Sequence, residues 1–411
     1  MKIFNRKLKI ISSVLLTLCM VFVMTACAEN SSQSEKSQPA EQTTVQPTTM
    51  SAEEINDRKL DKFISDMTLE EKVGQMFFVR CPDEGAVQQV SEYNIGGYIL
   101  FGRDFDGKTK DEVVDDIHSY QNEADIPLLI GVDEEGGTVV RVSSNPNLRE
   151  TPFLSPKDTY ADGGWDAVKQ DAEEKADLLL SLGINVNLAP VCDMTSDEYG
   201  FMYDRSFSSD VDMENRYVRT VVETSKSKKL GTVLKHFPGY GNNSDTHTGI
   251  AYDNRDYSEF ENTDFKPFYQ GIESGADCIL VSHNIVNCMD SEYPASLSQK
   301  VHDILRNEFK FDGVIMTDDL IMDAITDFTG DEAAAVTAAK CGNDLLCCSS
   351  VDTQYPAVLE AVQNGEISEA QVDASVKRIL KWKQNLGIFN IDTYQKKVKS
   401  TEPTDTVGSE E

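Results

Sequence analysis

Residues 231–249 read GTVLKHFPGYGNNSDTHTG and join an apolar run to a polar, glycine-rich loop. The run 231–234 is typical of a buried strand, and the polar residues begin where such a strand should end. His247 follows Asp245 by two residues, a spacing at which the carboxylate can orient and polarise the imidazole. An Asp-x-His spacing alone is also found in plain polar surface loops. The rest of the chain distinguishes the two interpretations.

Apolar runs of strand length recur along the chain, at residues 74–79, 97–101, 127–132, 185–190, 231–235, 278–282, 313–317 and 344–348. Stretches with helical periodicity lie between or after most of them, including 111–123, 166–182, 213–228, 257–274, 299–309, 354–363 and 369–384. Continuous apolar runs joined by crossover helices indicate parallel strands covered on both faces. Eight such units predict an α/β fold, a (β/α)₈ TIM-like barrel whose first strands are irregular. A doubly wound open sheet is the alternative.

Small polar groups follow most of the predicted strands. They are Asp133-Glu134-Glu135, Asp193, Lys235-His236, Ser282-His283-Asn284 and Thr317-Asp318-Asp319. The carboxyl ends of parallel barrel strands meet at one rim, where barrel active sites are built. No comparable cluster precedes the strands, so this distribution favours the barrel and places a candidate site at that rim.

The first residues have the pattern of a targeting segment. Four basic residues precede a mostly apolar run at 10–24, which has the length of a signal-peptide core rather than of a membrane span. Met24-Thr25-Ala26-Cys27 then resembles a bacterial lipobox. We therefore predict a lipoprotein signal peptide at 1–27, lipidation of Cys27, and extracytoplasmic attachment to the bacterial cell membrane. An uncleaved anchor and a plain secretory signal are the alternatives.

The two ends of the remaining chain differ in composition from its body. Residues 28–50 and 396–411 are polar, with few apolar side chains, and are predicted to be a disordered linker and a disordered tail. Residues 51–395 are long enough for one large barrel domain. The net charge of −32 is unfavourable for binding nucleic acid or anionic lipid. The pattern specifies no oligomeric state.

The nine cysteines do not form a metal or disulfide pattern. Cys19 lies in the leader, Cys27 is the lipidation candidate, and the other seven are an odd number without a Cys-x-x-Cys pair. Most are predicted to be buried, small apolar residues on strands. One disulfide in an extracytoplasmic setting is left open.

Several motifs occur in order over about residues 60–385. They are Gly131-Val132-Asp133-Glu134-Glu135-Gly136-Gly137 with Arg141, Gly183 to Val191, Asp204-Arg205-Ser206-Phe207, Lys235 to His247, Tyr293 to Ser298, and Gly313 to Leu320. Together they resemble glycoside hydrolase family 3, in its β-N-acetylglucosaminidase branch. The resemblance implies a (β/α)₈ barrel for residues 51–395. One departure is Tyr240, which stands where relatives commonly have a histidine, and the loop before Asp245 is a residue shorter than in some of them.

The resemblance implies a role for each matching residue. Asp318 matches the catalytic nucleophile, although either Asp318 or Asp319 could instead cap the following helix. His247 matches the general acid/base with Asp245 as its partner, whereas most glycosidases use two carboxylates. Sugar-binding positions are matched by Asp133, Arg141, Arg205, Lys235 and His236. No metal or cofactor is implied.

The implied activity is that of a retaining exo-β-N-acetylglucosaminidase. It would release terminal β-linked N-acetylglucosamine from cell-wall fragments or chitooligosaccharides through a covalent glycosyl-enzyme. A β-glucosidase or glycoside phosphorylase of the same fold is one alternative, and a catalytically dead sugar-binding lipoprotein is another. A further alternative places the proton donor on Glu134 or Glu135 and leaves His247 as a sugar contact on a loop that closes over the substrate.

Overall fold

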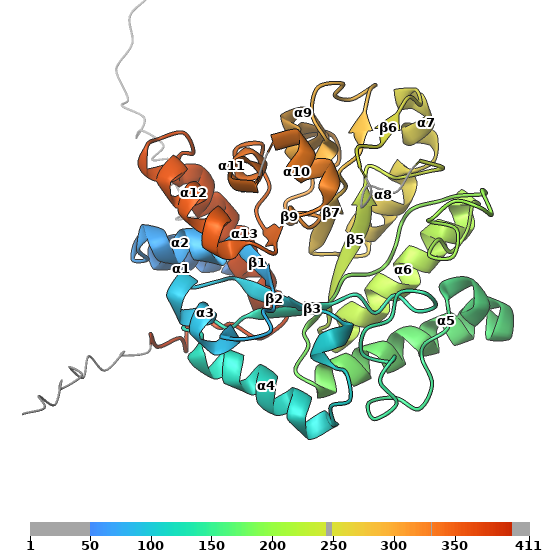
Figure 1. Cartoon of the computed structure of the whole chain (residues 1–411), viewed down its shortest axis with the longest axis horizontal. Coiled ribbons are helices and arrows are strands. Elements are labelled where there is room, and N and C mark those ends of the chain that lie inside the picture. The colour runs from blue at the N-terminus through green and yellow to red at the C-terminus, as the bar shows by residue number, and fades with distance from the viewer. Residues whose placement is uncertain (1–49, 244–248, 330, 397–411) are drawn as a thin grey trace, which may run out of the picture. The chain divides into compact units, whose positions relative to one another are not determined.

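The computed structural model describes residues 50–396, apart from residues 244–248 and residue 330. Eight strands form one sheet in the order β10-β1-β2-β3-β4-β5-β7-β9, and each neighbouring pair is parallel. A parallel bridge between Met316 and Leu345 joins β9 to the segment entering β10, so the sheet closes on itself. Helices lie outside these strands (Figure 1). The predicted (β/α)₈ barrel is therefore confirmed, and the open-sheet alternative is wrong.

The eight barrel strands are short and correspond to the eight apolar runs: β1 Phe77–Arg80, β2 Gly97–Leu100, β3 Leu129–Val132, β4 Val186–Asn187, β5 Gly231–Phe237, β7 Cys278–Val281, β9 Val314–Thr317 and β10 Leu346–Cys348. Two further short strands pair with each other outside the eight-stranded sheet. They are β6 (Tyr252–Asp253), which follows β5 in the chain, and β8 (Ile285–Val286), which follows β7.

The helices follow the strands in the order expected of βα units. Their bounds are α1 Ala52–Ser65, α2 Leu69–Gln75, α3 Ala86–Tyr93, α4 Lys110–Glu123, α5 Pro156–Ser181, α6 Val211–Lys228, α7 Tyr257–Asn262, α8 Phe265–Glu273, α9 Gln299–Asp303, α10 Asp323–Thr329, α11 Asp331–Lys340, α12 Val351–Gln363 and α13 Glu369–Asn385. A π-helical turn, Ile304–Glu308, extends α9. Helices α1, α2 and α4 begin with Ser or Thr followed by Glu three residues later, and each forms a complete capping box.

The first strands are regular, in contrast to the expectation. β1 and β2 run parallel to the other strands, with Phe78 opposite Gly97. The irregularity lies instead between β5 and β7, where the register shifts between Leu234 and Phe237. This shift occurs at the end of β5 that leads into Lys235 and His236, and it therefore affects the rim rather than the body of the barrel.

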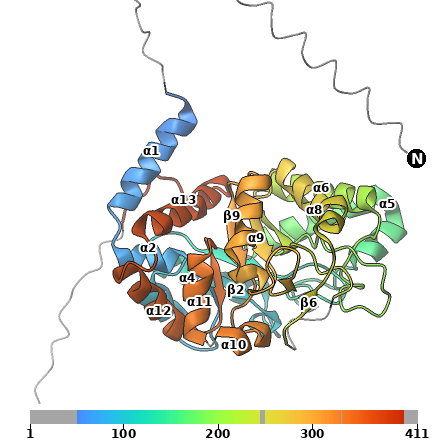
Figure 2. The same cartoon turned by 90° about the horizontal axis from the view of Figure 1, so that it is seen from above.

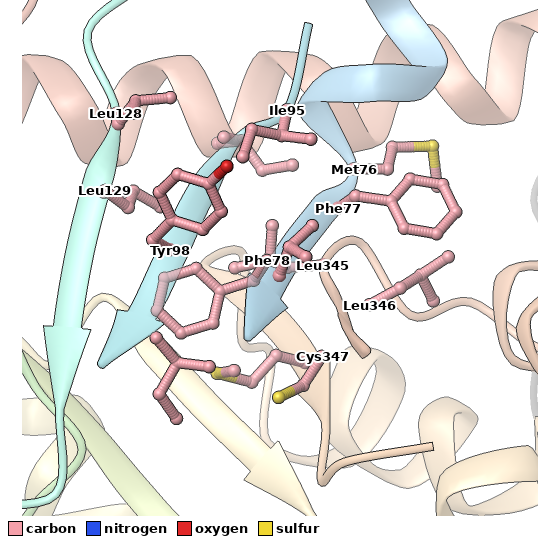
Figure 3. Close-up of a cluster of buried hydrophobic side chains, with 14 of the residues drawn as sticks. Met76, Phe77, Phe78, Ile95, Tyr98, Leu128, Leu129, Leu345, Leu346 and Cys347 are labelled. Carbon is pink, nitrogen blue, oxygen red and sulfur yellow. The ribbon is translucent and has the colours of Figure 1, made fainter. Parts of the chain in front are cut away.

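Alternate residues of each strand face the barrel interior and the helix layer. Phe77 and Phe78 lie on opposite sides of β1 (Figure 3). Phe78 reaches across the interior to β3, where a Cβ on Gly131 would lie 2.5 Å from its Cζ, so only glycine fits there. Phe77 packs edge-on against Tyr355 of α12. Both faces of the strands are buried, which explains their continuous apolar sequences.

The same alternation separates two apolar clusters on the later strands. Val233, Leu280 and Met316 belong to the cluster that includes the barrel interior. Leu234, Ile279 and Ile315 belong to a second cluster with residues of α6 and α8. Because side chains alternate with period two, Lys235 and Asp318 continue the interior series at the carboxyl rim.

The first and last helices pack together. α1 lies beside α13 (Figure 2), and Asn56 of α1 donates a hydrogen bond to Gln384 of α13 at 3.0 Å. Asp57 accepts Lys381 at 2.7 Å. On the inner face of α13, the buried Nζ of Lys383 donates to Oε1 of Gln75 at 2.8 Å.

Two helices differ from their predicted extents. α5 begins ten residues before the predicted stretch, and its chain leaves helical geometry at Gly163 and Gly164. The predicted helix 257–274 is divided into α7 and α8 because Thr263 is not helical. Beside this break the Asp264 carboxylate accepts two hydrogen bonds from Arg255.

Most of the described cysteines are buried, as expected, but of these seven only Cys278, Cys347 and Cys348 lie on strands. Of these seven, six are buried and all are free, and Cys288 is exposed. Among the described residues, no helix is long and apolar enough to cross a membrane. The predicted signal peptide with Cys27, the linker to residue 49 and the tail from residue 397 lie outside the described residues.

Candidate active site

The carboxyl rim of the barrel gathers most of the predicted site residues. Asp133 follows β3, Lys235 and His236 lie within β5, and Asp318 follows β9. Arg141 and Arg205 come from the loops after β3 and β4. Asp245 and His247 lie outside the described residues, so the structure does not test their predicted roles.

Lys235 joins two carboxylates at the centre of the site. Its Nζ lies 2.6 Å from Oδ1 of Asp133 and 2.6 Å from Oε1 of Glu135. Burial alone would lower the pKa of Lys235, but the charges of Asp133 and Glu135 outweigh burial and raise it. The lysine is therefore a fixed cation, and it orients the carboxylate of Asp133 at the carboxyl end of the barrel.

Glu135 is ionised by its surroundings. Nε and Nη2 of Arg205 donate to its two oxygens at 2.9 and 2.8 Å, which is the two-pronged geometry of a strong ion pair. Burial would raise the pKa of Glu135, yet the charges of Arg205 and Lys235 hold it well below its usual range. A carboxylate in this state has no proton to donate near neutral pH.

His236 is held in one tautomer. Nη2 of Arg205 can only donate, so Nε2 of His236, 3.2 Å away, accepts. Nδ1 then carries the proton and donates to Asp193 at 2.7 Å. The same carboxylate accepts the backbone N–H groups of His236 and Tyr240 at 3.0 and 2.7 Å. The imidazole is thus fixed in orientation.

Arg141 lies at the more open edge of this cluster. Its Nη2 is 4.0 Å from Oδ2 of Asp133, and its guanidinium lies over the ring of Phe101, 5.7 Å from the centroid. Exposure separates the side chains into two levels. Arg141, Asp133 and Arg205 are 30%, 15% and 15% exposed, whereas Lys235 and Glu135 are each 2% exposed. The first three can contact a ligand, and the last two support them.

Asp318 and Asp319 have different surroundings. Both oxygens of the Asp319 side chain are engaged, one by the backbone N–H of Ile321 at 3.2 Å and the other by the hydroxyl of Ser349 at 2.7 Å. Asp319 therefore stabilises the turn before α10 and does not cap a helix, because residues 320–322 are not helical and α10 begins at Asp323. Asp318 is partly exposed, and its Oδ1 accepts the N–H of Asp319 at 2.9 Å.

Asp318 and Asp133 each directly follow a parallel strand of the barrel, β9 and β3, so both lie at its carboxyl rim. Burial and then the negative charges of Asp319, Asp318 and Asp133 raise the pKa of Cys347 well above its usual value. All three residues follow strand ends at this rim, Asp133 after β3 and Asp318 and Asp319 after β9. This brings the predicted nucleophile and the predicted sugar-binding aspartate into one site.

Glu134 is occupied by the backbone. Its carboxylate accepts the N–H groups of Arg141, Val142 and Ser143 at 2.9, 2.7 and 3.3 Å, and the side chain is fully buried. With Glu135 ionised in a salt bridge, neither residue has the environment of a proton donor. The contacts disfavour the alternative that placed the acid on one of them.

Three members of the site were not assigned these roles from the sequence, although Glu135 was considered as an alternative acid and Asp193 was noted at a strand end. Asp193 fixes His236, Glu135 anchors Arg205, and Arg80 lies over Phe101 at 4.5 Å from the centroid. Asp193 and Glu135 each follow a strand, and that position was the signal available in the sequence. Arg80 ends β1 and gave no signal beyond its position.

An eight-stranded parallel barrel with carboxylates and fixed cations around its carboxyl rim defines a barrel enzyme that acts on a polar substrate. The chain belongs to glycosyl hydrolase family 3, because the N-terminal domain of that family matches residues 68–382.

Similar proteins carry related descriptions. A β-hexosaminidase of Hydrogenovibrio crunogenus is 31% identical over 286 residues, covering 68% of this chain and 79% of that protein. A β-hexosaminidase of Nitrosomonas eutropha is 32% identical over 273 residues, covering 64% and 77%. A family 3 β-N-acetylglucosaminidase structure from Paenibacillus sp. superposes with a TM-score of 0.74 at 29% identity. That match covers 84% of this chain, which spans 66% of the Paenibacillus chain.

Proposed function

We propose that this protein is a retaining exo-β-N-acetylglucosaminidase. The observation that carries the proposal is that Asp318 follows β9 at the same barrel rim as a fixed group of cations and carboxylates, in a chain of family 3 whose relatives are β-hexosaminidases. Asp319 is engaged in its turn, so Asp318 is the carboxylate better suited to react.

In the proposed mechanism, an oxygen of Asp318 attacks the anomeric carbon as the bond to the leaving oxygen breaks. His247, oriented by Asp245, gives its proton to that oxygen, and a covalent glycosyl-enzyme results. His247 then takes a proton from water, which displaces Asp318 and releases the sugar with retained configuration. The assignment of the proton to His247 is supported by the surroundings of Glu134 and Glu135, which leave neither suited to donate one.

The two levels of exposure suggest how a sugar would be held. Asp133, Arg141 and Arg205 are accessible enough to bond hydroxyl or acetamido groups. Lys235 and His236, which are more deeply buried, would act mainly by fixing Asp133 and Arg205. The predicted binding set therefore divides into contacting and supporting members. The proposed substrates are cell-wall fragments or chitooligosaccharides that end in β-linked N-acetylglucosamine.

We also propose that the enzyme is tethered outside the cytoplasmic membrane through lipidated Cys27. The support is the sequence Met24-Thr25-Ala26-Cys27 after a basic and apolar leader. A polar linker would then separate the lipid from Ser51, which caps the first helix.

The activity is tested by comparing purified protein on nitrophenyl N-acetylglucosaminide and nitrophenyl glucoside. A site built to bond an acetamido group leaves buried groups unpaired when that group is missing, which costs up to about 10⁴ to 10⁵-fold in rate. We expect the N-acetylglucosaminide to react faster by orders of magnitude. Equal rates would indicate a broad β-glycosidase, and no turnover of either would favour a sugar-binding lipoprotein. A sugar phosphate formed in phosphate buffer would indicate a phosphorylase.

A further inference from the structure

The turn Ser282-His283-Asn284 after β7 has no role in the mechanism above. Its histidine is fully buried and contacts the segment that carries the proposed nucleophile. Nε2 of His283 lies 3.0 Å from the backbone carbonyl oxygen of Asp319, and Nδ1 lies 2.7 Å from the hydroxyl of Ser296. The ring thus joins the end of β7 to the first turn after β9.

These contacts define which nitrogen of the neutral His283 ring carries the proton. A carbonyl oxygen can only accept, so Nε2 carries the proton and donates to Asp319. Nδ1 is then the acceptor, and the hydroxyl of Ser296 donates to it. The serine therefore holds the imidazole in the tautomer, and at the tilt, that the hydrogen bond to Asp319 requires.

Ser296 is itself held firmly. Its N–H donates to the carbonyl of Ser282 at 2.9 Å, and its own carbonyl accepts Nδ2 of Asn343 at 2.7 Å. Ser296 and Asn343 are both fully buried. A buried path of hydrogen bonds thus runs from the segment before β10, through Ser296 and His283, to the backbone beside Asp318.

The nucleophile segment receives support on each side of Asp318. The N–H of Asp318 donates to the carbonyl of Val281 at 3.2 Å, which fixes the chain on entry. The N–H of Asp319 donates to the Asp318 carboxylate at 2.9 Å, so the position of the Asp319 backbone sets the position of that carboxylate. His283 holds the carbonyl of this same residue.

We propose that His283, aligned by Ser296, is a positioning residue that holds the Asp318 carboxylate in line with the anomeric carbon. This inference rests on the proposed function in one respect, the assignment of Asp318 as nucleophile. It concerns catalysis and not substrate affinity, because His283 is fully buried and acts through the backbone. A misplacement of about 1 Å in a reacting group costs about 10²-fold in rate.

The test compares His283→Ala, His283→Gln and Ser296→Ala in the full chain. We measure kcat, KM and the rate at which a slow fluorinated glycoside forms the covalent intermediate, followed by intact mass. His283→Ala is expected to lower kcat and the trapping rate by about 10²-fold with little change in KM. His283→Gln should recover much of the loss, since its amide can donate to the same carbonyl. Ser296→Ala should lie between the wild type and His283→Ala.

His302→Gln is the matched control. His302 is equally buried, and its Nδ1 lies 2.7 Å from the carbonyl of Ser298. Its side chain contacts Asn343, at the far end of the path, but it bonds to neither Asp318 nor Asp319. This variant reports the general cost of changing a buried histidine, and its kcat should stay near that of the wild type. Thermal unfolding of every variant separates lost stability from lost catalysis.

Two results would overturn the inference. One is a His283→Ala variant that loses stability but keeps kcat and the trapping rate. The other is an equal loss in the Ala and Gln variants, which would mean that the hydrogen bond to Asp319 is not the cause. If the wild type instead prefers a glucoside, the proposed substrate is wrong, but the same comparison on that glucoside still tests His283.

Discussion

The guanidinium of Arg205 meets the carboxylate of Glu135 through two hydrogen bonds, 2.9 and 2.8 Å long, and both groups are largely withdrawn from water. The ion pair fixes a cation at the rim of the barrel next to His236. It also keeps Glu135 ionised, so that Glu135 supports the site and does not act as a general acid. The predictions below follow from this division between fixed charges and reacting groups.

Removing the charge of Glu135 should weaken the fold and the site together. Glu135→Gln leaves Lys235 and Arg205 short of a partner, and breaking such a buried pair costs about 3–5 kcal/mol of unfolding free energy. Calorimetry or denaturant unfolding measures this loss. Glu174→Gln is the control, because Glu174 pairs with Arg149 at the surface and should cost about 1 kcal/mol at most.

The same variant also tests where the proton comes from. Glu135→Gln should slow a natural disaccharide and an activated aryl glycoside by similar factors, because Glu135 gives no proton to the leaving group. A loss confined to the disaccharide would make Glu135 the acid.

Asp318 is predicted to form the covalent bond to the sugar. Asp318→Ala should abolish turnover while leaving thermal unfolding near that of the wild type, since its carboxylate is partly exposed. Peptide mapping after reaction with a slow fluorinated glycoside should find the label on Asp318. Asp319→Asn serves as the comparison, because its side chain is engaged by Ser349 and Ile321. Label on Asp319 would reverse the two assignments.

His247 is predicted to protonate the leaving oxygen. General acid catalysis contributes about 10² to 10⁴-fold, but a dinitrophenolate leaving group needs little of it. His247→Ala should therefore slow glycosylation severely on a disaccharide and much less on the dinitrophenyl glycoside. Asp245→Asn should give the same trend more weakly, because the imidazole remains. Equal slowing for both leaving groups would show that another group supplies the proton.

Cys27 is predicted to carry the lipid. Cys27→Ser should move the protein from the membrane fraction to the soluble or secreted fraction of the producing cells, which immunoblotting of the fractions measures. Cys19→Ser, in the predicted leader, is the control and should leave the distribution unchanged. Continued membrane association of the Cys27 variant would exclude lipid anchoring at this residue.

Lys383 should make stability depend on pH. Burial lowers its pKa to about 7, whereas an unfolded chain has a lysine pKa of about 10.4. Between these values the unfolded chain binds more protons, so the free energy of unfolding rises with pH across that interval. Below pH 7 both states hold the proton, and the cost of the buried charge is complete.

Lys383→Met should remove this dependence. At pH 6, removing the buried charge should stabilise the variant by on the order of a few kcal/mol. Leaving Oε1 of Gln75 without its donor should offset about 1–3 kcal/mol of this gain. The advantage should vanish near pH 10. Denaturant unfolding at both pH values measures it, and a variant whose stability has the same pH profile as the wild type would contradict the assignment.

The strands were the most predictable part of the fold. Each is buried on both faces, so each appears in the sequence as a continuous apolar run with a polar end. Helix 257–274 was not predictable in detail, because its periodicity continues through Thr263, where the chain breaks. Nothing in the periodicity reports the pairing of Asp264 with Arg255 at that break.

The position of the site was predictable from the sequence, but the hydrogen-bond and ion-pair partners within it were not. Strand ends marked Asp133, Lys235 and Asp318, since the carboxyl ends of parallel strands converge. The partners depend on the paths of loops, and Arg205 reaches Glu135 across 70 positions of sequence. Glu134 and Glu135 are adjacent, yet one binds backbone N–H groups and the other binds cations. Residue type alone does not separate them.

The packing of α1 against α13 has a mechanical consequence if the protein is tethered through Cys27. A pull on the linker reaches the folded chain at Ser51 and loads α1 first. α1 is held to α13 by the contacts of Asn56 and Asp57, and its Leu60 and Ile64 are buried in the main apolar cluster. A force on the anchor would therefore act first on the contact between α1 and α13, before it reaches the strands that carry the rim.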